Sequence, residues 1–158
     1  MHRRVLITGL VLLIFGVFGF ANDHYLKIDT NVNPKTIKQG YEGVLKIKIT
    51  PKDGIKISSH PEFIIKLNDN QNVTFSKKFF TATELDYQTT QENGTIFLEL
   101  EKEVPIPFKV NENSLRGKLI ISGEVVFTAV TADNWSLKTY QKFNADLRSK
   151  QNLNSKKK

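Results

Sequence analysis

Residues 44–50 read Val-Leu-Lys-Ile-Lys-Ile-Thr, and this short stretch indicates the fold class of the chain. Its apolar residues Leu45, Ile47 and Ile49 alternate one by one with polar residues. Side chains of a β-strand point alternately to opposite faces, so this period of two is typical of a strand with one buried and one solvated face. The stretch therefore predicts a strand of a sheet that covers a hydrophobic core.

Similar patterns recur along the chain, and residues rich in Gly, Pro, Asn and Asp separate them. No stretch has a convincing helical period. Seven to nine short strands in about 125 residues are typical of an all-β, antiparallel β-sandwich of the immunoglobulin-like kind, with a small closed barrel as the competing fold. The further expected strands are residues 25–29, 55–58, 63–67, 73–75, 95–101, 117–128 and 137–146.

Two local signals refine this prediction. Asn93-Gly94 is the dipeptide that favours a type I′ turn, so it predicts a tight hairpin. Pro105 and Pro107 have no backbone N–H to donate to a ladder. Their segment is therefore expected to be an edge strand or a connection between sheets.

The N-terminus has the pattern of a signal peptide. Arg3 and Arg4 precede an uncharged apolar run, residues 5–21, that ends in small residues. This pattern predicts a signal peptide over residues 1–21 with cleavage after Ala21, and an uncleaved membrane anchor is the alternative. Either interpretation predicts export, to the periplasm or extracytoplasmic space of a bacterium.

The 158-residue chain has 23 Lys+Arg, 16 Asp+Glu and a formal net charge of +7. The excess positive charge lies in residues 1–21 and in residues 147–158, whereas residues 22–146 carry equal numbers of positively and negatively charged side chains. A neutral body argues against nucleic acid as a partner. Residues 147–158 are expected to form a disordered basic tail, which would give at most weak attraction to an anionic membrane.

The composition excludes several kinds of chemistry. The chain has no cysteine, so it cannot form a disulfide, a thiolate nucleophile or an iron–sulfur cluster. Outside the leader only His24 and His60 remain, and neither lies in a metal-ligand spacing or a hydrolase motif. His60 is expected to be an exposed turn residue. We therefore expect no catalytic residues, no metal and no cofactor.

Aromatic residues suggest a binding surface instead. The only tryptophan, Trp135, follows the turn-forming run 131–134, so a hairpin with an aromatic residue near its tip is expected. Trp135 could fill the core or face a partner. Phe79-Phe80 is a second candidate, because adjacent strand residues point to opposite faces. The candidate partner-binding residues are Phe79, Phe80, Phe127, Val130, Trp135, Ser136 and Tyr140.

The order of these features resembles a known family. Gly40 begins the first strand region, residues 52–57 (Lys-Asp-Gly-Ile-Lys-Ile) follow, and 79–87 (Phe-Phe-Thr-Ala-Thr-Glu-Leu-Asp-Tyr) and 127–137 come later. Together they resemble the immunoglobulin-like N-terminal domain of the thiol:disulfide interchange protein DsbD. In that resemblance residues 79–87 are similar to a cap loop that shields the active site. Residues 127–137 are similar to a hairpin that carries two cysteines.

The resemblance places those cysteines at Val130 and Ser136. Neither side chain can form the mixed disulfide that thiol exchange requires, so the family's electron transfer is not carried over. The fold and the docking of a protein at this hairpin are carried over as expectations. We therefore expect an exported, non-catalytic module that binds an envelope protein or peptide. The alternative is an accessory factor in extracytoplasmic thiol-disulfide exchange or cytochrome maturation, acting with a thiol-bearing, thioredoxin-like partner.

Overall fold

The computed structural model describes residues 25–152, and these residues form two packed β-sheets. They contain no helix that could cross a membrane. The predicted signal peptide and the last six residues lie outside the described part of the chain. The strands are β1 (Leu26–Asn33), β2 (Thr36–Lys38), β3 (Glu42–Pro51), β4 (Ile55–Ser58), β5 (Ile64–Leu67), β6 (Val73–Phe75), β7 (Phe79–Thr81), β8 (Gln88–Glu92), β9 (Thr95–Glu99), β10 (Glu103–Val110), β11 (Gly117–Thr131) and β12 (Ser136–Lys150).

One sheet has the order β1-β3-β10-β6. The other has the order β2-β12-β11-β4-β9-β8, and β5 and β7 extend it beside β11. All pairings are antiparallel except that of β2 with β12. The chain is therefore an immunoglobulin-like β-sandwich, as its pattern predicts, and the competing closed barrel is wrong.

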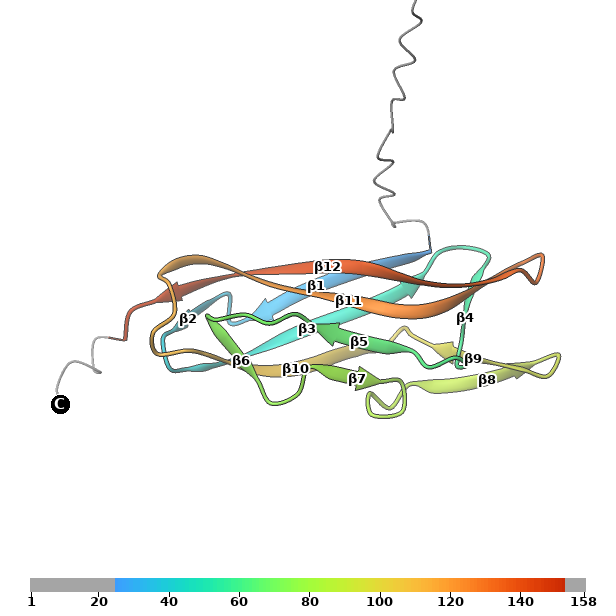
Figure 1. Cartoon of the computed structure of the whole chain (residues 1–158), viewed down its shortest axis with the longest axis horizontal. Coiled ribbons are helices and arrows are strands. Elements are labelled where there is room, and N and C mark those ends of the chain that lie inside the picture. The colour runs from blue at the N-terminus through green and yellow to red at the C-terminus, as the bar shows by residue number, and fades with distance from the viewer. Residues whose placement is uncertain (1–24, 153–158) are drawn as a thin grey trace, which may run out of the picture.

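Figure 1 shows the dominant feature, the long β11–β12 hairpin that runs the length of the molecule. Its turn and the turn of the β8–β9 hairpin project at the same end of the sandwich. The end of β12 lies at the opposite end of the molecule, near β2.

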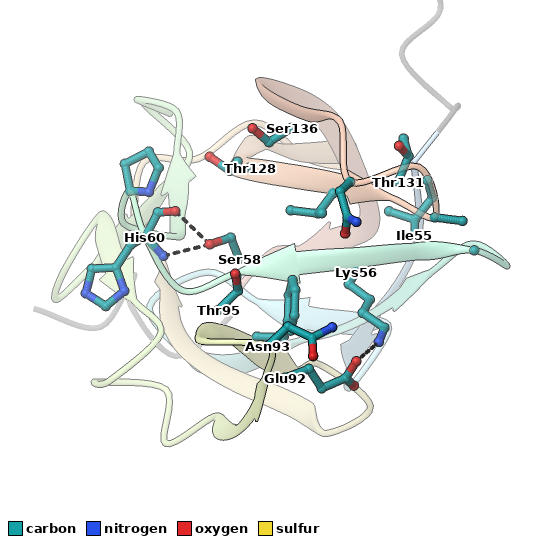
Figure 2. Close-up of a pocket in the computed structure, with 16 residues that line it drawn as sticks. Ile55, Lys56, Ser58, His60, Glu92, Asn93, Thr95, Thr128, Thr131 and Ser136 are labelled. Atoms are coloured by element: carbon teal, nitrogen blue, oxygen red, sulfur yellow. Dashed lines mark hydrogen bonds and ion pairs between the residues drawn. The ribbon is translucent and has the colours of Figure 1, made fainter.

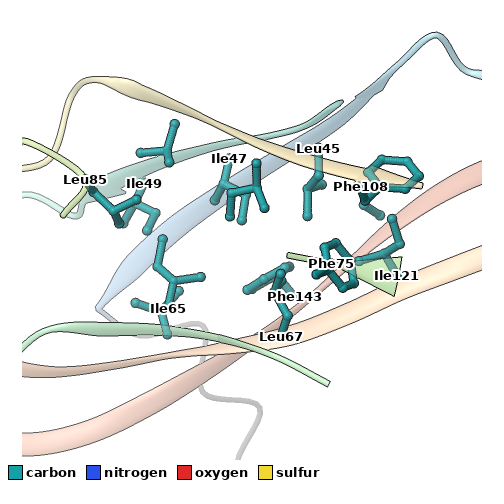
Figure 3. Packing of buried hydrophobic residues seen from close by; sticks show 14 of the residues in the cluster. Leu45, Ile47, Ile49, Ile65, Leu67, Phe75, Leu85, Phe108, Ile121 and Phe143 are labelled. Atoms are coloured by element: carbon teal, nitrogen blue, oxygen red, sulfur yellow. The ribbon is translucent and has the colours of Figure 1, made fainter. Parts of the chain in front are cut away.

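The core lies between the two sheets. Leu45, Ile47 and Ile49 of β3 have no exposed surface, so the alternation in residues 44–50 sets their inward face. Figure 3 shows them opposite Ile65 and Phe143 of the other sheet. Burial of each such side chain contributes about 1.5–3 kcal/mol to folding, which makes the facing apolar layers the main source of stability.

Two expectations on strand number and extent are corrected. Twelve strands form instead of seven to nine, because short strands such as β2 and the fully exposed β8 carry no apolar alternation. The sequence also predicts a basic tail from residue 147 onward. However, β12 continues to Lys150 and buries Leu147 and Ser149, so the first four of those residues belong to the sheet.

The Asn93-Gly94 signal is confirmed, and the proline signal is right for only half of its strand. Asn93 and Gly94 have φ values of 47° and 82°, as a type I′ turn requires, and Glu92 pairs with Thr95 across them. Pro105 and Pro107 lie in β10, which pairs with β3 on one side. On its other side β10 pairs with β6 only from Phe108 to Val110, so the proline half has a free edge.

Candidate functional site

Val130 and Ser136, the two positions that the resemblance assigns to cysteines, are directly paired at the end of the β11–β12 hairpin. The Thr131 N–H donates to the Trp135 carbonyl at 2.9 Å, which makes residues 131 and 135 the hydrogen-bonded pair. The next pair, Val130 with Ser136, is then of the closer type, with Cα atoms about 4.5 Å apart. Both side chains reach the same cleft.

The turn itself is held by its own residues. Asn134 has a φ of 58° and donates its N–H to the Thr131 carbonyl at 2.9 Å. The Trp135 N–H donates to Thr131 Oγ1 at 3.3 Å. These bonds fix the tip of the hairpin and leave the Trp135 side chain 58% exposed. Trp135 is therefore a surface residue next to the cleft, and of the two alternatives for this residue the one in which it fills the core is wrong.

The cleft lies between the two hairpins that project at one end of the sandwich (Figure 1), and its volume is about 720 Å³. Strand β4 connects its walls, because β4 pairs with β11 over four residues and with β9 at the single pair Ser58–Phe97. Figure 2 shows Thr128, Thr131 and Ser136 on one side and Glu92 and Asn93 on the other. The lining residues are Gly54, Ile55, Lys56, Ser58, His60, Pro61, Glu92, Asn93, Thr95, Phe97, Thr128, Val130, Thr131, Ala132, Asn134 and Ser136.

The charged side chains of the cleft neutralise each other. Lys56 forms an ion pair with Glu92 from the opposite hairpin (Figure 2). The Lys56 ammonium also lies 5.4 Å from the centroid of the Phe97 ring, within the range of a cation–π contact. No other lysine, arginine or carboxylate lines the cleft among residues 25–152. The remaining lining atoms are hydroxyl, amide, imidazole and apolar groups.

One wall is set by the turn from Ser58 to Pro61. Ser58 Oγ donates to the His60 carbonyl at 2.7 Å and accepts from the His60 N–H at 3.2 Å. The imidazole Nδ1 lies 2.8 Å from Ser59 Oγ. Consistent with the sequence, His60 is an exposed turn residue, and its ring is held at the rim of the cleft.

Thr128 is the unusual residue of the floor. Its side chain is only 7% exposed, and its hydroxyl has no hydrogen-bond partner among the described residues. A buried polar group without a partner costs about 1–3 kcal/mol. Thr128 is in register with Ser58, whose hydroxyl is already used by His60. The Thr128 hydroxyl oxygen is itself fully buried, so it is not open to a group that enters the cleft.

The other candidate residues occupy three different environments. Tyr140 and Phe79 are 45% and 53% exposed. Phe80 is partly buried against the core, with Lys77 Nζ 6.0 Å from its ring centroid. Phe127 is 1% exposed and packs edge-on against Tyr25, so its assignment to the partner surface is wrong. Along β11, Phe127 faces the same side of the sheet as the inward residues, whereas Val130 faces the opposite side.

Phe79 is on the same sheet as the cleft but not beside it. Phe79 pairs with Lys66 of β5, and Lys66 pairs with Glu124 of β11. Glu124 precedes Val130 by six residues, which corresponds to about 20 Å along β11. No residue of 79–87 lines the cleft. Instead, Tyr87 packs on Phe63 with ring centroids 5.7 Å apart, and Leu85 is buried. The expected cap loop therefore packs away from the Val130–Ser136 pair.

The outward faces of the two sheets differ in charge. Strands β1, β3, β6 and β10 carry four cations and three carboxylates. More cations lie on strands β2, β5, β11 and β12 of the other sheet. Within the described residues, only two of these cations form ion pairs: Lys66 with Glu124, and Lys118 with Asp146. We call this the basic face, made of seven cations and two carboxylates: Lys38, Lys66, Lys118, Lys138, Lys142, Arg148, Lys150, Glu124 and Asp146.

The single candidate residues named from the sequence omit Lys56, Glu92 and Thr128, although Thr128 lies in the 127–137 hairpin at which a partner is expected to dock. Each lies in a different hairpin or strand, and the non-local pairings of β4 with β11 and of β4 with β9 bring them together. Nothing in the local pattern separates Thr128 from any other strand threonine. Residues 25–152 contain no group of three or more His, Asp or Glu side chains that could hold a metal ion.

Comparisons with known proteins add little to this geometry. No protein-family model matches the chain, and no curated protein matches it. Among solved structures, the major pilin subunit BcpA of Bacillus cereus is 10% identical with a TM-score of 0.41 over 77% of this chain. This chain spans only 40% of that pilin subunit.

Two cohesin modules are similar to the same extent. One, from a family 33 glycoside hydrolase of Clostridium perfringens, is 9% identical with a TM-score of 0.42 over 81% of this chain and 98% of that one. The other, from a cohesin–dockerin complex of Clostridium thermocellum, is 12% identical with a TM-score of 0.40 over 78% and 99%. Similarities this weak carry no conclusion about function.

Proposed function

We propose that this protein is an exported, non-catalytic β-sandwich module that binds an envelope protein or peptide. The binding surface is the end of the β11–β12 hairpin with the cleft beside it. The observation that carries the proposal is the position of Trp135, a large aromatic side chain 58% exposed at a turn whose backbone is fixed by its own hydrogen bonds. Exposed tryptophans on rigid supports are frequent anchors of protein interfaces.

Two further features support the same surface. Tyr140 is 45% exposed on β12, on the strand that begins at Ser136. The cleft beside the hairpin tip has a volume of about 720 Å³, within the range of cavities that accept a ligand. An aromatic residue next to a cleft gives a partner both a surface to cover and a recess to enter.

The basic face extends from this site along β12. Lys138 and Lys142 flank Tyr140 on the same side of the strand, and neither forms an ion pair within the described residues. Complementary charge steers association and selects partners. The partner is therefore proposed to present an acidic surface to the basic face.

Export rests on the signal peptide pattern of residues 1–21. We propose the extracytoplasmic space of a bacterium as the location, where the partner is an envelope component. The absence of cysteine fits any oxidising or reducing compartment, so it does not restrict this proposal.

A second candidate function is an accessory role in extracytoplasmic thiol-disulfide exchange or cytochrome maturation. The observation that favours it is the cross-strand pairing of Val130 and Ser136, which the resemblance to the DsbD N-terminal domain assigns to cysteines. A chain without thiols would hold a thioredoxin-like partner without forming a covalent intermediate.

Affinity capture from the envelope fraction tests both candidates. Wild-type protein is compared with a Trp135→Ala/Tyr140→Ala variant and with Tyr41→Ala, a control in which another half-exposed tyrosine is removed. Loss of a specific partner by the double variant and its retention by the control supports the proposed surface. Equal recovery by all three folded proteins contradicts it. Identification of the partner as a thioredoxin-like protein favours the second candidate.

A further inference from the structure

We infer that the free edge of β8 accepts an extended segment of the partner as an added strand, and that this segment has no acidic residue where it pairs. The inference rests on the proposed function, because the segment belongs to the partner that binds at this end of the sandwich. Three observations on the described residues carry it: unpaired backbone groups at an open edge, protection of the other edges, and carboxylates on both faces beside β8.

Strand β8 pairs with β9 on one side only, and all five of its residues are exposed. In a two-residue type I′ hairpin the residues that flank the turn, here Glu92 and Thr95, exchange both backbone hydrogen bonds. Bonded positions alternate along the strand, so the N–H and C=O groups of Thr89 and Gln91 point away from β9. Within residues 25–152 no hydrogen bond reaches these outward groups, and Figure 1 shows no strand beyond β8.

An edge of this kind is a template for another strand, because its outward N–H and C=O groups can all be paired by an extended backbone. Proline and lysine, which natural edge strands use against such pairing, are absent from residues 88–92. A segment laid beside β8 would exchange backbone hydrogen bonds with both Thr89 and Gln91. This is strand addition, in which main-chain bonds supply affinity and alternate side chains supply selectivity.

The other edges of the described sheets are protected or short. Val110 donates its N–H on the β3 side, so the alternate positions Pro105 and Pro107 face the free edge of β10. A proline has a carbonyl but no N–H, so this edge cannot pair fully with a strand. The outer edge of β1 lies against β12, where Gln141 Nε2 donates to the Leu26 carbonyl at 2.9 Å. Strands β2, β6 and β7 have three residues each.

The side chains around β8 define the chemistry of the segment. Glu99 of β9 is exposed on one face of the β8–β9 ribbon. On the other face, Thr89 and Ile96 line a hollow of about 480 Å³ whose lining contains the carboxylate of Glu62 and no lysine or arginine. Like charges placed opposite each other on neighbouring strands are destabilising. The segment is therefore uncharged or basic, and an apolar side chain on the second face can cover Ile96, which is 37% exposed.

A segment of the partner fits this edge better than a second copy of the chain. Pairing of two copies through β8 alone would use five residues a side, too few for the interface of about 1,200 Å² that a stable dimer needs. A partner that also covers Trp135 and the cleft has further surface to bury. The turn of the β8–β9 hairpin lies at the same end of the molecule as the turn that precedes Trp135 (Figure 1).

Peptide binding followed by amide hydrogen exchange tests this inference. Twelve-residue peptides displayed on phage are selected on the immobilised protein, and enriched peptides are synthesised and titrated. Exchange of the Thr89 and Gln91 amide protons is measured by NMR with and without peptide. Gln91→Pro removes an outward N–H, which an edge strand tolerates, and Gln91→Ser is the matched control that keeps this N–H.

We expect enriched peptides that lack acidic residues in their central stretch and slow the exchange of the Thr89 and Gln91 amide protons. These peptides should bind Gln91→Pro about tenfold more weakly than wild type and should bind Gln91→Ser equally well. Gln91→Pro should retain the denaturation midpoint of wild type, because the N–H that it removes faces solvent. The exchange measurement uses the wild-type protein, so it decides the inference even if Gln91→Pro does not fold.

Four outcomes overturn the inference: no enriched peptide, peptides that bind without slowing exchange at Thr89 and Gln91, equal affinity for folded Gln91→Pro, or selection of acidic peptides at this edge. Slowed exchange of the same amides on concentration of the protein alone would identify a second copy as the occupant and would also overturn it.

Capture of the envelope partner separates this inference from the proposed function. Loss of the partner in Trp135→Ala/Tyr140→Ala but not in Gln91→Pro would refute the inference and leave the proposed function standing. Equal capture of envelope partners by the double variant would count against the proposed function, whereas peptide-dependent protection of Thr89 and Gln91 would still support strand addition at β8.

Discussion

Val130 and Ser136 are directly opposed in the β11–β12 hairpin, next to the hydrogen-bonded pair of Thr131 and Trp135, on the side of the sheet that lines the cleft. Their pair is of the non-hydrogen-bonded type, with Cα atoms close enough for a disulfide. The arrangement explains how a hairpin of this shape could hold a cysteine pair without any change of backbone.

The double variant Val130→Cys/Ser136→Cys is therefore expected to form an intramolecular disulfide in air. The closed loop of seven residues should raise the free energy of unfolding by at most about 2 kcal/mol. Titration of free thiols before and after reduction checks this result, and Val130→Cys/Lys138→Cys is the control with the register shifted. Persistent free thiols in the first variant would show that the pairing is wrong.

We expect that Gly123 of β11 cannot be replaced by a residue with a side chain. A Cβ placed there would lie 2.5 Å from Cζ of Phe143 and 2.6 Å from the Lys66 carbonyl oxygen. Gly123→Ala should lower the free energy of unfolding by about 3 kcal/mol, since both neighbours are fixed in the sheet. Gly54→Ala, which has open space but a φ of 76°, should cost only about 1–2 kcal/mol. Equal costs in denaturant unfolding would contradict the packing around Gly123.

Much of the fold could be predicted from alternation alone. Leu45, Ile47 and Ile49 point inward because a period of two puts them on one face, and Asn93-Gly94 defines its hairpin through local backbone preference. The end of β12 could not be found in this way. Leu147 and Ser149 alternate with cationic residues, and this local pattern is typical of a solvated tail. Only the pairing of β12 with β11 and β2 shows that Leu147 and Ser149 are buried.

The candidate site was only half predictable. The phase of β11 already places Phe127 with Val125 and Ala129, so its burial could have been deduced from the sequence. The exposure of Trp135 could not, because it depends on turn hydrogen bonds to Thr131. The cleft could not be predicted either. Three segments far apart in sequence form it, and long-range strand pairing leaves no local signal in the sequence.

Tyr87 is expected to make stability depend on pH in the alkaline range. Burial raises the pKa of Tyr87 to about 12, whereas its unfolded value is near 10. Below pH 10 both states are protonated and the full stability is present. Between about pH 10 and pH 12 only the unfolded state loses the proton, so stability falls as pH rises, by on the order of 2 kcal/mol in all.

The variant Tyr87→Phe should lack this alkaline loss. Its stability at pH 7 should equal that of wild type or exceed it by up to about 1 kcal/mol, because the Tyr87 hydroxyl is buried without a hydrogen-bond partner among the described residues. Denaturant unfolding of both proteins at pH 7, 9 and 11 provides the comparison. Parallel pH profiles for the two proteins would argue against burial of the hydroxyl.

Binding of the captured partner should depend on salt through the basic face. Lys138→Gln/Lys142→Gln removes two exposed cations beside Tyr140, and association should slow severalfold at low ionic strength. The difference should shrink above about 0.5 M salt, where exposed charges are screened. Lys48→Gln, on the outward face of the other sheet, is the control and should have little effect. An equal effect of Lys48→Gln would remove the case for an acidic partner on this face.

The most direct measurement is site-specific photo-crosslinking in the native envelope. A crosslinking amino acid is placed at Ser136, beside the cleft, and in a second protein at Lys109, exposed on the opposite sheet. A partner that binds at the hairpin and cleft should give a discrete adduct from position 136 and none from position 109. The same adduct from both positions, or an adduct from position 109 alone, would contradict the proposed binding surface.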